Sequence, residues 1–169
     1  MNTRIFFKLS FGIFLAWNAL AQIFTGQTWW FIQNVNLVFH EAGHVLFYPF
    51  PHFLTLIAGS IIEIAVPFSI TCYFIVHHKF MSAVFGSWWL ATATLSVSIY
   101  AADANERVLP LITGDINTHD WYNILQPLGL LQYDDQFGFF FWCASLASVI
   151  LLLVVLTYDK DVKNLFNSH

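Results

Sequence analysis

The chain has 169 residues, of which 58% are hydrophobic, 19% are aromatic and only 9% are charged, with a formal net charge of −4. A soluble domain would carry roughly a quarter charged residues, and one of this size could not hide 19 phenylalanines and seven tryptophans in its core. We therefore expect a single integral membrane domain over residues 1–169, and the total of six lysines and arginines excludes a nucleic-acid-binding protein.

Apolar runs long enough to cross a bilayer define the predicted fold. A hydrocarbon core about 30 Å thick requires roughly 20 mostly apolar residues in a helix. Four segments meet this requirement, at residues 5–24, 53–76, 81–100 and 137–156. The first segment also fits a secretory signal peptide, because the small residues of Ala19-Leu20-Ala21 resemble a cleavage site; we expect it to be an uncleaved anchor.

A fifth segment, 29–50, is apolar but interrupted by polar side chains. These are Gln33, Asn34, Asn36, His40, Glu41 and His44. Such a helix would be costly to expose to lipid, so we expect it to pack among other helices and to be only partly embedded. If it does not cross the membrane, five of the six basic residues share the side of the N-terminus and only Arg107 lies opposite, as the positive-inside rule favours.

The stretch 101–136 is polar and holds six of the ten acidic residues. A short amphipathic helix is expected to begin near Trp121, capped by Asn117 or Thr118, and to lie at the membrane interface. The predicted fold is thus all-α: a bundle of four transmembrane helices, a polar and partly embedded helix, and an interfacial amphipathic helix. In this topology both termini are cytoplasmic, and the polar helix and the acidic stretch lie at the outer face.

His40-Glu41-Ala42-Gly43-His44 is an HExxH sequence in a helical context. Residues four apart lie on one face of a helix, so the two imidazoles can bind one metal ion. Zinc lowers the pKa of a bound water towards neutrality, and Glu41 is placed to take the proton from it. The alternative is that the two histidines only satisfy each other or backbone carbonyls in a buried helix. We expect the metal site, because buried polar residues in membranes are expensive and tend to be functional.

The sequence FHEAGH at 39–44 resembles the HExxH helix of zincins, and specifically that of membrane-embedded metallopeptidases of the site-2-protease type. The sequence AGS at 58–60 is loosely similar to the small-residue segment that follows their motif. The resemblance implies zinc as the cofactor and peptidase-like hydrolysis of a membrane-protein substrate. That family takes its third ligand from an Asp-Gly motif in a later span, whereas the adjacent pair here, at 114–115, has the reverse order. HEAGH with His-Asp-Trp at 119–121 also looks like a pattern in small bacterial membrane proteins, so we expect a bacterial inner membrane.

A catalytic zinc takes three protein ligands, and the third must come from outside the motif. We expect His119, with Asp120 and Asp103 as alternatives for a metal ligand or a residue that orients one. Their non-metal interpretations are an exposed loop residue for His119, a helix N-terminal charge for Asp120, and an ion pair with Arg107 for Asp103. Glu63, in the middle of a span, is either a neutral hydrogen-bonding residue packed on the polar helix or a partner that orients a histidine.

The sequence therefore favours a membrane-embedded zinc hydrolase, peptidase-like, in which His40, His44 and a residue of 101–136 bind the metal and Glu41 is the general base. Two alternatives stay open. One is a metal-dependent hydrolase of a lipid amide or ester, because aromatic walls in the bilayer suit acyl chains. The other is a non-catalytic metal-binding subunit of a larger assembly, in which four protein ligands close the metal site.

Overall fold

The computed structural model describes residues 3–166, and these residues form seven α-helices and no strand. Two short 3₁₀ turns, Ile116–Thr118 and Leu131–Tyr133, precede α5 and α6 respectively. The helices are α1 (Thr3–Thr25), α2 (Trp30–Phe47), α3 (His52–Val76), α4 (Phe80–Ala102), α5 (Asp120–Leu125), α6 (Asp134–Tyr158) and α7 (Lys160–Phe166).

Four stretches in the described part of the chain are long and apolar enough to cross a membrane. They are α1, α3, α4 and Leu131–Tyr158, which includes α6. The polar helix α2 is not among them, although it has 18 residues. The predicted all-α membrane bundle, with four spans and a separate HExxH helix, is confirmed. The tail after the last span forms the short helix α7, which the sequence analysis did not predict.

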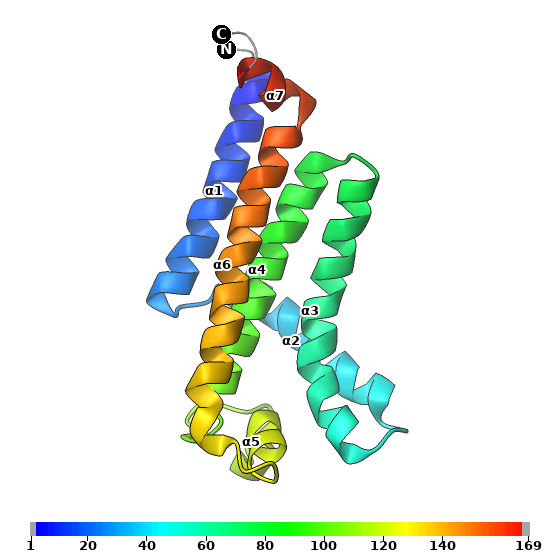
Figure 1. Cartoon of the computed structure of the whole chain (residues 1–169), viewed down its shortest axis with the longest axis vertical. Helices are drawn as coiled ribbons and strands as arrows, with labels where there is room; N and C mark the ends of the chain where they lie inside the picture. Colours follow the sequence, from blue (N-terminus) through cyan, green and yellow to red (C-terminus); the bar gives the residue numbers. More distant parts are fainter. Residues whose placement is uncertain (1–2, 167–169) are drawn as a thin grey trace.

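The central helix of the bundle is α4. In its apolar stretch 72% of the residues are buried inside the protein, against 33% in each of the other three spans. Its small residues let neighbouring backbones approach closely. A Cβ atom added to Gly86 would lie 2.6 Å from Thr71 Oγ1 of α3, and one added to Gly138 of α6 would lie 2.6 Å from Ala102 Cβ. Helices α3 and α6 flank α4 through these contacts (Figure 1).

Buried amides join α1 to the rest of the bundle. The Trp88 indole of α4 donates a hydrogen bond to Asn18 Oδ1 at 2.8 Å, and the Gln22 amide donates to the same oxygen at 2.9 Å. Gln22 Oε1 accepts a hydrogen bond from the backbone of Trp29, just before α2, at 2.9 Å. Because polar groups are costly to bury unless they are paired, this chain of hydrogen bonds sets how α1 enters the bundle and where α2 begins.

The two ends of the bundle differ in charge. The start of α1, the turn between α3 and α4, and α7 lie at one end, whereas α5 and the turn between α2 and α3 lie at the other (Figure 1). Arg107, in the loop that follows α4, belongs to the end that carries α5. The other five basic residues belong to the first end: Arg4, Lys8, Lys79, Lys160 and Lys163.

A partly buried ion cluster ties α1 to the C-terminal turn, and its loss is expected to destabilise the bundle. Lys8 Nζ lies 2.7 Å from Asp159 Oδ1 and 2.7 Å from Asp161 Oδ2, and the Lys8 and Asp159 side chains are only 19% and 11% exposed. Lys8→Met should lower the free energy of unfolding by about 2–3 kcal/mol, because it leaves a shielded carboxylate without its partner. Unfolding in detergent micelles measures this change.

Arg4→Met is the matched control, because Arg4 contacts Asp161 at 3.3 Å with a side chain that is 74% exposed. It should cost less than about 1 kcal/mol. Equal losses in the two variants would show that the burial of Lys8 adds nothing to the stability of the bundle.

Candidate metal centre

The two histidines of the HExxH motif lie where α2 crosses α3. Gly43, between them in the sequence, packs so closely that an added Cβ would collide with the backbone carbonyl of Ala58. On α3, a Cβ added to Gly59 would lie 2.6 Å from His40 Nε2 and 2.7 Å from His44 Nε2. The two glycines therefore allow the helices to touch and leave the space that both imidazoles occupy.

A backbone carbonyl fixes the orientation of His44. Its Nδ1 lies 2.8 Å from the Thr55 carbonyl oxygen, which can only accept, so Nδ1 carries the proton and donates it. His44 Nε2 faces the opposite way and lies 3.1 Å from Asp120 Oδ2. In the neutral ring this nitrogen has a lone pair, which is what a metal ion requires of a histidine.

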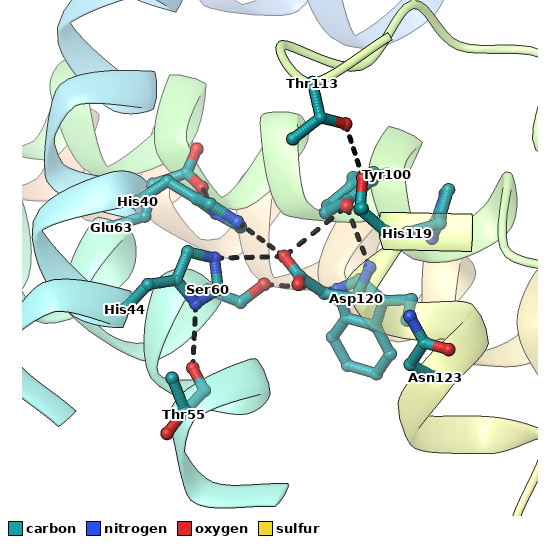
Figure 2. Close-up of polar contacts among 12 residues, drawn as sticks. His40, His44, Thr55, Ser60, Glu63, Tyr100, Thr113, His119, Asp120 and Asn123 are labelled. Atoms are coloured by element: carbon teal, nitrogen blue, oxygen red, sulfur yellow. Dashed lines mark hydrogen bonds and ion pairs between the residues drawn. The ribbon is translucent and has the colours of Figure 1, made fainter. Parts of the chain in front are cut away.

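His40 is held in the same manner by a buried carboxylate (Figure 2). Its Nδ1 lies 3.0 Å from Glu63 Oε2, and its Nε2 lies 3.0 Å from Asp120 Oδ2. Glu63 is only 3% exposed, and its second oxygen, Oε1, has no hydrogen-bond partner. Glu63 thus hydrogen-bonds a histidine of the motif on α2, a contact that belongs to both arrangements predicted for it.

Helix α5 brings Asp120 to the histidines from the acidic stretch. The backbone N–H of Asp120 donates to the Tyr100 hydroxyl at 3.0 Å, and this hydroxyl lies 3.4 Å from Asp120 Oδ2. The next residue, Trp121, donates its indole N–H to Ser60 Oγ of α3 at 3.1 Å. The start of α5 is thereby fastened to both α3 and α4 (Figure 2).

His40, His44 and Asp120 together form a group that can hold a metal ion, with one ligand atom from each residue and all three atoms within 4.8 Å of one another. His40 and Asp120 are buried and His44 is half-buried. Nitrogen and oxygen ligands about 2.0–2.1 Å from a tetrahedral zinc lie roughly 3.3 Å apart, close to the separations of the histidines from Asp120.

The charges of this group are strongly coupled. Burial disfavours the charged form of His40, but hydrogen bonds to Asp120 and Glu63 outweigh it and raise the pKa of His40 to about 9. The hydrogen bond to Asp120 also raises the pKa of His44. Burial would raise the pKa of Asp120, but its hydrogen bonds to the two histidines lower it overall. The carboxylate thus requires positive charge beside it, which either protons on the imidazoles or a bound cation can supply.

The structure places His119, the residue expected as third ligand, outside this group. It is the N-cap of α5, its Nδ1 accepts a hydrogen bond from the Tyr122 backbone N–H at 3.3 Å, and its Nε2 lies 3.4 Å from Asp103 Oδ2. The side chain is fully buried, and burial lowers its pKa. The expectation that Asn117 or Thr118 caps this helix is wrong, because the imidazole of His119 itself provides the acceptor.

Asp103 organises the loop that leaves α4. Its two carboxylate oxygens accept hydrogen bonds from the backbone N–H groups of Val108 and Leu109, at 2.9 and 3.1 Å. The guanidinium of Arg107, its ion-pair partner in the non-metal interpretation, lies over the Tyr122 ring, 4.0 Å from the centroid. Asp103 therefore connects this loop to His119 and, through the cap, to α5.

A cavity of about 850 Å³ opens beside the three clustered side chains. His40, His44 and Asp120 line it together with Glu41, and Glu41 is exposed. The loop 109–113 also lines it. A ligand held by the three side chains would therefore have open space on one side, with the carboxylate of the HExxH motif in the same space.

Sequence reasoning did not identify Thr55 and Tyr100 as contacts of this group. No motif marks them, because each acts through its position on a neighbouring helix. Gly59 lies in the small-residue segment that carried part of the family resemblance. Its contact with both imidazoles explains why a residue without a side chain stands at this position.

Comparisons with protein-family models, with curated proteins and with solved structures found no match to this chain.

Proposed function

We propose that this protein is a membrane-embedded, zinc-dependent hydrolase that cleaves an amide or ester bond by peptidase-like chemistry. One observation carries the proposal: three ligand atoms converge on one wall of a cavity that Glu41 also lines. Three protein ligands and an open position are typical of catalytic zinc sites, whereas structural sites are closed by four.

In this proposal His40, His44 and Asp120 hold the zinc. Nitrogen and carboxylate ligands suit zinc, and a bound zinc would lower the pKa of a water and polarise the substrate carbonyl. Glu63 and Thr55 keep the protons of the two imidazoles on Nδ1, so that both Nε2 atoms remain available. Such outer contacts orient the ligands and strengthen metal binding.

Glu41 is the general base of the proposed reaction. It lines the cavity together with His40, and because it is exposed its carboxylate can reach a water there. After taking a proton from the water, it can return the proton to the departing nitrogen or oxygen of the substrate. These two transfers are the chemistry that HExxH helices perform in zinc peptidases.

A closed structural metal site requires a fourth protein ligand. The sequence offers His119 and Asp103 for this role, but His119 Nδ1 caps α5, His119 Nε2 faces Asp103, and the Asp103 carboxylate binds the loop after α4. This arrangement favours the catalytic interpretation over the non-catalytic subunit.

The charge distribution supports an orientation for the proposed enzyme. Five of the six basic residues lie at the end that carries both the start of α1 and α7, so the positive-inside rule assigns this end to the cytoplasm. The metal centre, at the end that carries α5, then faces the outer side of the proposed bacterial inner membrane. The partners in this orientation are the lipid bilayer and a substrate that reaches the site from it or from the outer surface.

Zinc removal tests the proposed function. The purified chain in lipid nanodiscs is incubated with a blocked apolar peptide and with a fatty-acyl amide, and released amine is measured together with zinc content. We expect a zinc chelator to abolish amine release and added zinc to restore it, because the metal activates the water. Amine release that persists after zinc has been removed would contradict the proposal.

A further inference from the structure

An apolar segment interrupts the acidic stretch between α4 and α5. Residues 108–112 read VLPLI, and no charged residue occurs between Arg107 and Asp115. We call residues 108–112 the apolar loop. Two of its side chains, Val108 and Ile112, are 75% and 66% exposed. Exposed apolar side chains rimmed by polar residues mark a surface that contacts a membrane or another molecule.

The backbone of the apolar loop is suited to a place with little water. Asp103 is only 7% exposed, and its two carboxylate oxygens accept the backbone N–H groups of Val108 and Leu109 at 2.9 and 3.1 Å. The third residue, Pro110, has no N–H group. The first three residues therefore leave no backbone donor unpaired. A loop surrounded by water has no need of a buried carboxylate for this purpose, whereas irregular backbone close to hydrocarbon does.

The apolar loop lies where two membrane spans end. Val108 follows Ala102, the last residue of α4, by six positions, and the next stretch that can cross a membrane begins at Leu131. The loop therefore lies at the end of the bundle that carries α5 (Figure 1). Lipid is the partner that the two flanking spans bring next to it. The apolar side chains of α5 are instead buried in the bundle: Trp121, Ile124 and Leu125.

We propose that the apolar loop dips into the lipid leaflet at this end of the bundle, which is the outer leaflet in the proposed orientation. Val108 and Ile112 would reach about 5–10 Å into the boundary between headgroups and acyl chains. The exposed carboxylates of Glu106 and Asp115, on either side of the loop, would stay among headgroups and water. This inference concerns membrane contact and does not depend on the proposed hydrolase function.

The insertion has a consequence for the metal centre. Leu109 and Leu111 of the apolar loop line the same cavity as His40, His44 and Asp120. A loop anchored in the leaflet therefore places one wall of this cavity at the lipid surface. A ligand dissolved in the leaflet would meet the cavity at that wall, without first entering bulk water.

Fluorescence quenching by lipid tests this placement in the full-length chain. The native Cys72 and Cys143 are replaced by alanine, and single cysteines introduced by Val108→Cys and Ile112→Cys are labelled with bimane. Each labelled chain is reconstituted, one per disc, in phosphatidylcholine nanodiscs whose lipid is either unmodified or brominated in the upper part of its acyl chains. Bromine quenches a fluorophore that it contacts, so the loss of emission reports contact with the acyl region. Iodide in the buffer reports contact with water.

Glu106→Cys and Phe140→Cys are the matched controls. Glu106 is an exposed residue just before the apolar loop, and Phe140 is 65% exposed in the span that contains α6. We expect brominated lipid to remove about half or more of the emission at positions 108, 112 and 140, because side chains at the interface reach the acyl boundary. Position 106 should respond mainly to iodide.

Both loop positions are exposed, so labelling them leaves the packing of the bundle intact. If brominated lipid lowers the emission at 108 and 112 no more than at 106, while iodide lowers it as much, the loop faces water and the inference is overturned. That result would assign the apolar side chains to contact with another protein. Neither measurement requires a bound metal, so their failure would leave the proposed function standing.

Discussion

Replacing Glu41 by glutamine is expected to slow hydrolysis by about 100- to 10,000-fold while the zinc content stays that of the wild-type protein. The substitution keeps the size of the side chain and removes the carboxylate that takes a proton from water. Because Glu41 is exposed towards the cavity, its replacement leaves the packing of α2 on α3 intact. Amine release from the two test amides, divided by the zinc content, measures the effect.

Glu106→Gln is the matched control, since Glu106 is an exposed carboxylate in the loop after α4. It should change neither turnover nor zinc content. Unchanged turnover in a zinc-containing Glu41→Gln protein would show that Glu41 is not the general base. Loss of zinc together with turnover would assign Glu41 to metal binding.

Replacing Gly59 by alanine is expected to weaken zinc binding by about 100-fold, at the upper end of losses caused by residues that support a metal site. The new methyl group would lie 2.6 and 2.7 Å from the Nε2 atoms of His40 and His44, the proposed ligand atoms. Neither ring can turn away without losing its hydrogen bond to Glu63 or Thr55. Alanine is a better helix former than glycine by about 1 kcal/mol, so α3 itself is not weakened.

The control for this variant is Gly12→Ala in α1. A Cβ at that position would lie 2.7 Å from a methyl group of Leu156, a flexible side chain far from the metal centre. Competition with a fluorescent zinc chelator measures both affinities. If Gly59→Ala binds zinc as tightly as Gly12→Ala, the space beside Gly59 is not what positions the two imidazoles.

The membrane bundle could be predicted because its signals are local in sequence. Apolar runs of the length of a bilayer mark α1, α3, α4 and α6, and the polar side chains of α2 set it apart from them. The i, i+4 spacing of His40 and His44 places both on one helix face whatever the rest of the fold does. These features require no knowledge of long-range contacts.

The rest of the metal centre depends on contacts between distant parts of the chain. His119 and Asp120 are neighbours, and sequence alone cannot decide which of them faces α2. In the structure His119 has an extended backbone, with φ −69° and ψ 113°, and its side chain turns back to cap α5. Asp120 is the first residue of the helix and projects towards the histidines. Helix capping decides which of the two residues faces α2: because His119 caps α5, Asp120 and not His119 reaches the histidines. The sequence had favoured Asn117 or Thr118 as the cap.

The pairing of Glu63 with His40 was open for a similar reason. A carboxylate in the middle of a span must find a partner or lose its charge, and this much follows from the sequence. Which partner it finds depends on how α2 crosses α3, and that crossing is set by the contact between Gly43 and Ala58. The small residues Gly43 and Ala58 can be read from the sequence, but the angle at which the two helices cross cannot.

The zinc content of the purified protein tests the central claim most directly. After loading with zinc and removal of the excess, wild-type protein and the variants His44→Ala and His77→Ala are compared by elemental mass spectrometry. His77, at the opposite end of α3 from the metal centre, serves as the control. We expect about one zinc per chain in the wild-type protein and in His77→Ala, and none in His44→Ala. A wild-type protein without zinc, or a His44→Ala variant that retains it, would contradict the account.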